Sequence, residues 1–569
     1  MSQTWRPTLI AALCAALLLL AGCDGGGGDE DAGLDATLDG DAGEDAGEDA
    51  GEDAGEDAGE DAGEDAGEDA GEDAGEDAGA DAGEDAGEDA GEDAGEDAGE
   101  DAGEDAGADE GATPSYGLSL LPLDGWQRGP VRVDLVAMGP AGELGDVGLS
   151  FSQDGTAFVP ATALPGSLAG CHGLGLSPAG VPGRCVWDSK ADLEVDAQVW
   201  LRASLRVGGT VRATDELGPL ELHDARDFDR PGLVAHFYGP GASLLWLRAD
   251  GSLEDTGQDL ATPERASLVA FTADGRFGAV LAEGDGGVHH TLTPFAVARD
   301  GAVSALGGTL DIQALDLMGS DLVPAPDGSG LWLTYRTGQG GLFFLSFEGG
   351  APALLEDAAG GHLLLPMTLP AGLAILPDNR RAIVSGGALV IDDPPYDLTL
   401  LDLQSLTVLD QQVAGVGSLA DTVAVTSDGA LALVPAADPW NDPPNPQVLV
   451  VRFDGDTISS WTSVPVVGAA RVAIHPADGA ALVTSWDQDA VYVLDLSSDP
   501  PALVQTLTVG LADHLTCVRE GSLAGLCLVS SVAELVPLRL SPDASVVRGT
   551  PLGFGGGNAG IVYGAAIQP

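Results

Sequence analysis

One pattern recurs about every 50 residues in the second half of the chain, and no other feature restricts the fold as strongly. Each copy has an apolar strand, a short turn and a second apolar strand, as in VAFTADGRFGAVLAE and VAIHPADGAALVTSW. An acid stands in each turn, at Asp274, Asp327, Asp378, Asp428 and Asp478. A third strand and often a fourth follow, as in AVYVLDLSS and PALVQTLTVG. We therefore expect one four-stranded antiparallel sheet for each copy.

Two further units extend the series, and the second of them is divided between distant segments. LTCVREGSLAGLCLVSS is a degenerate sixth copy, with its turn near Glu520 and Gly521. GLVAHFYG and ASLLWLRADGSL, after residue 230, look like second and third strands without a first, whereas GIVYGAAIQP at the end looks like a first strand without followers. Joining these pieces completes a seventh sheet and removes exposed sheet edges. The sequence predicts an all-β fold with a seven-bladed β-propeller at residues 229–569.

The best copy also carries a family resemblance. VAIHPADGAALVTSWDQDAVYVLDLSSDPPALVQTLTVG resembles the YVTN-type propeller repeat of bacterial surface proteins. Seven-bladed propellers related to that repeat include lactonase-like enzymes. The resemblance implies a fold and a cell-envelope context far more than a chemistry, because one fold hosts many functions.

The start of the chain has the pattern of a lipoprotein signal. The apolar run Leu9–Leu20 is too short to span a bilayer as a helix, and it ends in Leu20-Ala21-Gly22-Cys23. This motif resembles the lipobox of bacterial lipoproteins, which implies a signal peptide at residues 1–22 and lipidation of Cys23. Lipid anchoring of that kind would hold the protein on the periplasmic side or the cell surface of a bacterial envelope. The alternative is a secretory signal with an incidental cysteine.

Residues 23–112 are dominated by repeats of Glu-Asp-Ala-Gly. Of the 92 acids that give the chain its net charge of −70, 40 lie here, with no Lys or Arg among them. Such a segment cannot bury enough apolar surface to order itself, so we predict a disordered, extended tether. Calcium binding by the paired acids is the alternative, although their spacing matches neither an EF-hand loop nor the glycine-rich nonapeptide calcium repeat. The acidic charge of the whole chain argues against a nucleic-acid partner.

Residues 113–228 alternate apolar and polar positions between turn signals. VWDSKADL and VWLRASLRV resemble the Ig/fibronectin-like modules of bacterial envelope proteins, which implies a small β-sandwich with Trp187 in its core. Cys171 and Cys185 flank a loop rich in Gly and Pro, and an exported protein should join them in a disulfide. A second disulfide is expected between Cys517 and Cys527, on the first two strands of the sixth copy.

Three loops between second and third propeller strands combine acids with an aromatic residue: IDDPPYD, ADPWNDPPNP and SWDQDA. They define a candidate ligand face of Asp392, Asp393, Tyr396, Asp397, Trp440, Asn441, Asp442, Trp486, Asp487 and Asp489. Aromatic faces beside Asp and Asn suit a sugar or a peptide, and clustered carboxylates suit Ca²⁺, the one cofactor that the sequence suggests. The plain alternative is that Pro, Asp and Asn only form turns.

Support for catalysis is weaker. The histidines match no metalloprotease, deaminase or triad signature, so we assign no catalytic residue. A lactonase-like or other hydrolytic site needs a carboxylate, a histidine and an arginine together, and Glu283, His289 and Arg336 are the candidates. We interpret the chain as a lipid-anchored envelope protein whose tethered propeller binds or displays a protein or glycan without catalysis. A hydrolytic propeller enzyme is the alternative.

Overall fold

The structure is a computed structural model of the chain. It describes residues 115–569 except for 168–170, 237–239, 285–289, 313–318, 336–339, 356–362, 366–369, 387–396, 415–421, 437–446, 486–487, 532–533 and 555–561. Pro114–Pro569 form one compact unit. Among the described residues, no helix is long and apolar enough to cross a lipid bilayer. The expected signal peptide, Cys23 and the tether lie outside this range.

Residues 115–228 fold into two antiparallel sheets, which we call the N-terminal module. One sheet has the order β1 (Gly117–Leu120), β2 (Val131–Met138) and β6 (Val181–Trp187). The other has the order β4 (Val159–Pro160), β3 (Leu144–Ser152), β7 (Ala197–Val207) and β8 (Thr210–Leu222), with β5 (Leu174–Gly175) also paired to β3. Every second residue of β2 and β7 is buried, because strands that cover a core on one face alternate in this way.

Trp187 lies at the centre of the core between the two sheets. Its side chain is fully buried and stacks on Phe151 with ring centroids 5.0 Å apart. The indole Nε1 donates a hydrogen bond of 2.7 Å to Asp192, in the short helix α3 (Ser189–Asp192). This confirms the expected role of Trp187 as a core residue. Membership of the Ig/fibronectin-like class stays a prediction.

Seven four-stranded blades follow. Blade 1 contains the second half of β11 (Leu253–Phe271), β12 (Phe277–Glu283), β13 (His290–Val297) and β14 (Val303–Ala305), with β15 (Leu310–Asp311) also on β13. Blade 2 contains β16 (Gly319–Pro324), β17 (Gly330–Tyr335), β18 (Gly341–Ser346) and β19 (Ala353–Leu355), with β20 (Leu363–Leu364) on β18. Blade 3 contains β21 (Pro370–Ile375), β22 (Arg381–Gly386), β23 (Asp397–Asp402) and β24 (Thr407–Val413).

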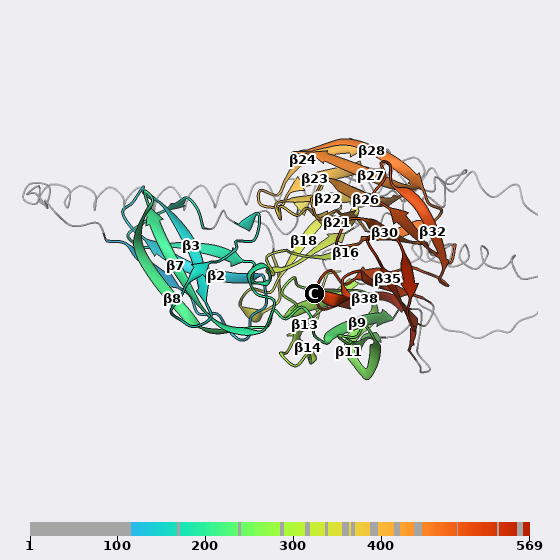
Figure 1. Ribbon diagram of the computed structural model, residues 1–569, viewed down its shortest axis with the longest axis horizontal. Coiled ribbons are helices and arrows are strands. Elements are labelled where there is room, and N and C mark those ends of the chain that lie inside the picture. Colours follow the sequence, from blue (N-terminus) through green and yellow to red (C-terminus); the bar gives the residue numbers. More distant parts are fainter. Residues whose placement is uncertain are drawn as a thin grey trace, which may run out of the picture. The chain divides into compact units, whose positions relative to one another are not determined.

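Blade 4 contains β25 (Ala424–Val425), β26 (Leu431–Ala436), β27 (Gln447–Asp454) and β28 (Thr457–Pro465). Blade 5 contains β29 (Ala469–Ile474), β30 (Ala480–Ser485), β31 (Ala490–Asp495) and β32 (Ala502–Thr508). Blade 6 contains β33 (Leu515–Cys517), β34 (Leu526–Ser530), β35 (Glu534–Leu540) and β36 (Val546–Arg548), with β37 (Leu552–Gly553) on β35. In Figure 1 the outermost strands β24, β28 and β32 follow one another along the rim, and β16, β21 and β30 lie further in.

Blade 7 joins the two ends of the propeller, as the sequence predicts. The last strand, β38 (Val562–Ile567), pairs with β9 (Arg230–His236), which pairs in turn with β10 (Pro240–Leu247). The first half of β11 completes this blade, and the same strand then runs on into blade 1. Apolar side chains packed between neighbouring blades form the core, so the predicted seven-bladed all-β fold is confirmed.

The acids in the repeated turns hold the backbone in place. Asp274 and Asp428 accept hydrogen bonds from the threonine hydroxyls two residues earlier, at 2.6 and 2.7 Å. Asp327 accepts the N–H of Ser329 at 2.9 Å, and Asp378 accepts two consecutive backbone N–H groups. The carboxylate of Asp478 instead accepts the N–H of Ser427 in the preceding blade. The repeated acid is thus a turn-forming residue, the usual role of Asp between strands.

Both expected disulfides are present. Cys171 and Cys185 are joined within the N-terminal module, and Cys517 and Cys527 join β33 to β34 in blade 6. Cys517 and Cys527 are direct cross-strand partners, so their disulfide links two strands that are already paired.

The N-terminal module contacts the end of the propeller where the repeated turns lie, which we call the turn end. Arg184 bonds Glu348 in the outer turn of blade 2 at 2.5 Å, and Lys190 bonds Glu520 in the turn of blade 6 at 3.1 Å. The backbone carbonyl of Trp126 accepts a bond from Arg276 in the turn of blade 1. Contacts with three blades fix the module against the turn end.

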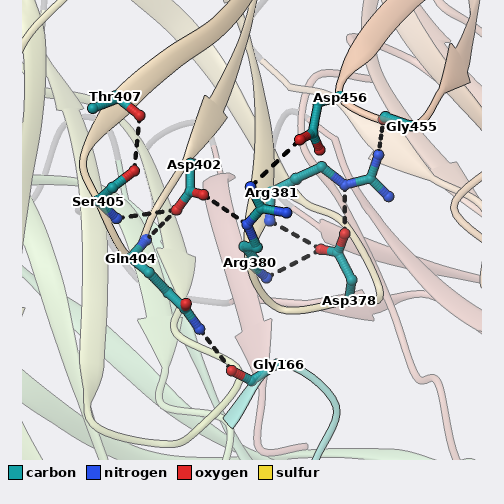
Figure 2. A network of polar contacts seen from close by, with 10 residues as sticks. All are labelled: Gly166, Asp378, Arg380, Arg381, Asp402, Gln404, Ser405, Thr407, Gly455 and Asp456. Carbon is teal, nitrogen blue, oxygen red and sulfur yellow. Dashed lines mark hydrogen bonds and ion pairs between the residues drawn. The ribbon is translucent and has the colours of Figure 1, made fainter. Parts of the chain in front are cut away.

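A network in blade 3 makes a further contact with the module. Figure 2 shows Arg380 between Asp402 and Asp456, at 2.6 and 3.5 Å, which ties blade 3 to the outer turn of blade 4. Gln404 in the same network donates to the carbonyl of Gly166 at 2.7 Å. Nearby, the amide of Asn379 donates to the carbonyl of Pro165 at 2.8 Å.

Candidate functional site

The predicted ligand loops join second to third strands, so they belong to the end opposite the turn end, which we call the loop end. In blade 3 the flanking strands stop at Gly386 and resume at Asp397, in blade 4 they stop at Ala436 and resume at Gln447, and in blade 5 they stop at Ser485 and resume at Ala490. Antiparallel strands place all these stops at the same end of the blades.

Most of the predicted ligand residues lie outside the described residues. These are Asp392, Asp393, Tyr396, Trp440, Asn441, Asp442, Trp486 and Asp487. Asp397 begins β23, and the structure describes its backbone only. Whether the loops converge on one ligand therefore stays a prediction, as does the calcium site. No three His, Cys, Asp or Glu side chains gather as a metal site in the described part of the chain.

Asp489 is the one predicted ligand residue whose side chain is described. Its backbone has φ +51°, in the left-handed region that Asp tolerates better than most residues. The carboxylate accepts the N–H of Leu511 at 2.8 Å, and the backbone carbonyl accepts the N–H of Val509. Through these two hydrogen bonds, Asp489 connects the loop end of blade 5 to the segment that leads into blade 6.

Glu283 is the described member of the predicted catalytic set, since His289 and Arg336 lie outside the described residues. It ends β12 at the loop end of blade 1. Its cross-strand partners are Arg265 on β11 and His290 on β13. Cross-strand partners point to the same face of a sheet, so these three residues form a row across the blade. No sequence pattern indicates Arg265, because cross-strand register is not visible in a linear pattern.

The loop end also contains buried polar residues from blades 5 to 7. The N–H of Arg471 donates to the hydroxyl of Thr484, and the N–H of His514 donates to that of Ser530. His514 Nδ1 accepts the N–H of Ala565, on the first strand of blade 7. These groups satisfy one another's hydrogen bonds, as buried polar groups must.

A pocket of about 390 Å³ lies between the N-terminal module and the turn end of blades 7 and 1. Its lining comes from segments far apart in the chain: Trp126, Arg128, Asp196, His223, Ala225, Phe228, Asp229, Pro231, Trp246, Arg248, Ala298, Arg299, Asp300, Gly301 and Gln568. No sequence pattern predicts this site. The charged segment HDARDFDRPG was its only local sign, and it reads as a linker between domains.

Local geometry explains how the blade 1 side of the pocket forms. The backbone of Ala298 to Ala302 closes a tight turn, with the N–H of Gly301 bonded to the carbonyl of Ala298 at 2.9 Å. Gly301 has φ +80°, and a Cβ there would lie 2.1 Å from Cη2 of Trp246. Only glycine fits both the backbone conformation and the close approach of the indole ring.

Several arginines surround the pocket. Arg128 and Arg230 lie on the ring of Phe228, with guanidinium carbons 4.0 and 4.4 Å from its centroid. Arg230 donates to the carbonyls of Gln568 and Arg226. Burial, followed by the charge of Arg230, lowers the pKa of Arg128 to about 10, so its guanidinium remains charged at neutral pH.

No protein-family model matches the chain, and no curated protein matches it. Among solved structures, the chain is similar to a periplasmic gluconolactonase of Pseudomonas aeruginosa, at 14% identity and a TM-score of 0.44, over 60% of this chain and 99% of that one. A protein from Lactobacillus plantarum gives 10% identity and a TM-score of 0.45, over 60% and 99%. The β-propeller domain of Cps50 from Myceliophteria thermophila gives 11% and 0.36, over 53% and 93%. Likeness at this level carries no information about chemistry.

Proposed function

We propose that the chain is a lipid-anchored protein of the bacterial cell envelope whose propeller binds a protein or glycan without catalysing a reaction. The docking of the N-terminal module is the observation that supports it best. The module contacts the turn end in blades 1, 2, 3 and 6. The ligand loops belong to the opposite end, which is the end that a module fixed to the turn end leaves accessible.

The fold suits a rigid binding platform. The ligand loops join paired strands of the four-stranded sheets in blades 3, 4 and 5, and β38 closes the ring that contains these blades. Prolines in two of these loops, at 394–395 and 443–444, limit the conformations of the unbound chain, which lowers the entropy lost on binding. An aromatic side chain on each loop gives the type of contact that dominates recognition surfaces.

Photo-cross-linking in intact cell envelopes tests this function. Two full-length chains would each carry a cross-linking amino acid beside one ligand loop. One chain is otherwise native, and the other also contains the substitutions Trp440→Ala and Trp486→Ala. We expect the double substitution to abolish the cross-linked product. Trp461→Ala is the matched control, because Trp461 is a 36% exposed tryptophan on the outer strand β28. Equal products from the native and doubly substituted chains would refute the assignment of the ligand face.

The lipid anchor has a separate test. Cys23→Ala removes the only thiol that the lipobox provides for acylation. We expect the variant to lose palmitate labelling and to move from the membrane fraction to the soluble fraction, since stable anchoring depends on the acyl chains. Cys517→Ala, which alters a cysteine of blade 6, should stay in the membrane fraction. A Cys23→Ala chain that remains membrane-bound would contradict lipid anchoring through this residue.

A hydrolytic function is the second candidate, and the row of Arg265, Glu283 and His290 favours it. A carboxylate next to a base and a cation is a common arrangement for activating water. Turnover of γ-butyrolactone or p-nitrophenyl acetate by the full chain, lost in Glu283→Gln, would support this candidate. If Glu283→Gln leaves the turnover unchanged, the row of Arg265, Glu283 and His290 is not the catalytic site.

A further inference from the structure

The pocket between the N-terminal module and the turn end, which we call the junction pocket, contains a buried positive charge that lies on the ring of Phe228. Arg128 is only 4% exposed and lines the pocket. Its Nε has no hydrogen-bond partner, and within the described residues no carboxylate lies at ion-pair distance from its guanidinium. A buried arginine without an ion pair is costly, because contact with an aromatic ring and attraction to more distant acids replace its lost hydration only in part.

The other charged groups of the pocket are already engaged. Arg248 bonds both Glu254 and Asp229, at 2.9 and 2.8 Å. Asp229 also accepts the N–H of Ala249, and Asp300 accepts the N–H of Ala302. Glu520, Asp224 and Asp196 favour the charged form of Arg128 from a distance, but no carboxylate among the described residues lies at ion-pair distance, so its guanidinium can still pair with a bound anion.

His223 adds a second unpartnered group to the same pocket. Its Nδ1 bonds the carboxylate of Asp196 at 3.0 Å, which fixes the orientation of the imidazole. Its Nε2 is buried and has no hydrogen-bond partner. Trp126 packs edge-on against the ring with centroids 5.8 Å apart, so the imidazole lies between an acid and an indole.

The walls of the pocket are aromatic. Trp126 comes from the N-terminal module and Trp246 from β10 in blade 7, and both are partly exposed. Arg299 lies at the rim, with a side chain that is 62% exposed and bonded to Glu221. Flat apolar walls with a few fixed polar groups are typical of small-molecule sites.

We propose that this pocket binds a small organic anion, whose carboxylate or phosphate pairs with Arg128 and whose ring packs against Trp126 and Trp246. Guanidinium is the protein group best shaped for such anions, because it offers parallel N–H donors. The unpartnered Nε2 of His223 adds a polar contact. This site lies at the turn end and does not depend on the ligand face at the loop end.

Isothermal titration calorimetry on the full chain tests the proposal with three probes: benzoate, phenyl phosphate and benzyl alcohol. We expect one or both anions to bind and the neutral alcohol to bind at least about tenfold more weakly, as the loss of a charged hydrogen bond requires. Comparison of benzoate with phenyl phosphate identifies the preferred anion. No binding of either anion at millimolar concentration, or tighter binding of the alcohol, would overturn the proposal.

Two substitutions locate the binding. Arg128→Gln should weaken anion binding by at least about tenfold. Arg202→Gln is the matched control, because Arg202 also lies over an aromatic ring, that of Phe158 at 3.7 Å, but pairs with Glu216 away from the pocket. Equal affinities in both variants would overturn the assignment.

Stability gives an independent readout. If the Arg128 charge is kept for a ligand, Arg128→Gln should leave the ligand-free chain as stable as the native one or more so, because an uncompensated buried charge is removed. A large loss of thermal stability would instead show that Arg128 serves the fold through its contact with Phe228. Arg128→Lys, which keeps the charge without the planar donors, should fold and bind anions with intermediate affinity.

Discussion

A single buried side chain, His514, makes the propeller sensitive to pH. Its Nδ1 accepts the N–H of Ala565 at 3.3 Å, and an imidazole nitrogen that accepts a hydrogen bond carries no proton. Burial, together with the nearby charge of Arg471, lowers the pKa of His514 well below its ordinary value. The folded chain therefore holds this histidine neutral at a pH where the unfolded chain protonates it.

The sign of the pH effect follows from this difference. We predict that the contribution of His514 to the free energy of unfolding is highest above pH about 6.5. It falls as the pH drops from there towards the lowered pKa, by up to about 1.4 kcal/mol per pH unit for one proton, and levels off below that pKa. His514→Gln should lose this part of the slope, since it cannot take up the proton. Urea denaturation of both chains across this pH range measures it. Parallel stability curves for the two chains would contradict the prediction.

At the scale of the element, β38 decides whether the propeller closes. It pairs with β9, and Val562 and Ala565 of this strand are buried against blades 6 and 7. After the strand, Gln568 donates its side-chain amide to the carbonyl of Gly275 in the turn of blade 1, and its own carbonyl accepts from Arg230. One short strand therefore connects blades 6, 7 and 1.

Removal of residues 562–569 should destabilise the chain by roughly 5 kcal/mol or more, given the apolar side chains that lose their burial. It also leaves the edge of β9 unpaired, and such an edge pairs with other chains. We expect a lower melting temperature and aggregation in size-exclusion chromatography. Deletion of Pro569 alone is the control and should behave like the native chain. A monomeric, equally stable truncated chain would contradict the role of β38.

The blades could be predicted from sequence because each one repeats a local signal. The turn acids, the degenerate unit at Glu520 and the split blade are all visible as strand and turn patterns. The continuous strand β11 could not be predicted from sequence, because Gly257 and Pro263 suggest a break between the two blades. There the chain passes from the outer strand of blade 7 to the inner strand of blade 1 and pairs on both sides.

At the scale of the whole molecule, docking of the N-terminal module depends on a few polar contacts of unequal strength. Lys190 is largely buried, at 12% side-chain exposure, and bonds Glu520. Beside this pair, the N–H of Ser522 donates to Asp227 at 2.7 Å. In contrast, Arg299 and Glu221 form an exposed pair at the same junction. Exposed pairs contribute little, whereas a buried cation without its partner is strongly unfavourable.

We therefore predict that Glu520→Gln destabilises the docked arrangement by about 1–3 kcal/mol, the range for hydrogen bonds to charged groups. Differential scanning calorimetry should show a lower melting temperature and separate transitions for the module and the propeller. Glu221→Gln, the matched exposed partner, should change stability by less than about 0.5 kcal/mol. Similar thermograms for the two variants would show that the Lys190 pair does not hold the module.

The junction pocket exists only at this largest scale, which is why no sequence pattern predicted it. Trp126, Trp246 and Gln568 are brought together by docking and by ring closure, not by spacing along the chain. The ligand loops are the opposite case, because their acids and aromatics form short local patterns. Candidate loops can therefore be found in the sequence, whereas a site assembled from distant segments can be recognised only in the folded structure.

Because the last strand closes the propeller, the ring cannot form until synthesis of the chain is almost complete. Arg230 and Gln568, which are hydrogen-bonded in the finished propeller, are 338 residues apart in sequence. Ribosomes add roughly 5–20 residues per second, so β9 waits on the order of 20 to 60 s for its partner. Throughout that interval the ring is open and β9 has a free edge. The nascent chain therefore has an unpaired sheet edge for tens of seconds, and other chains can pair with that edge until the final residues emerge.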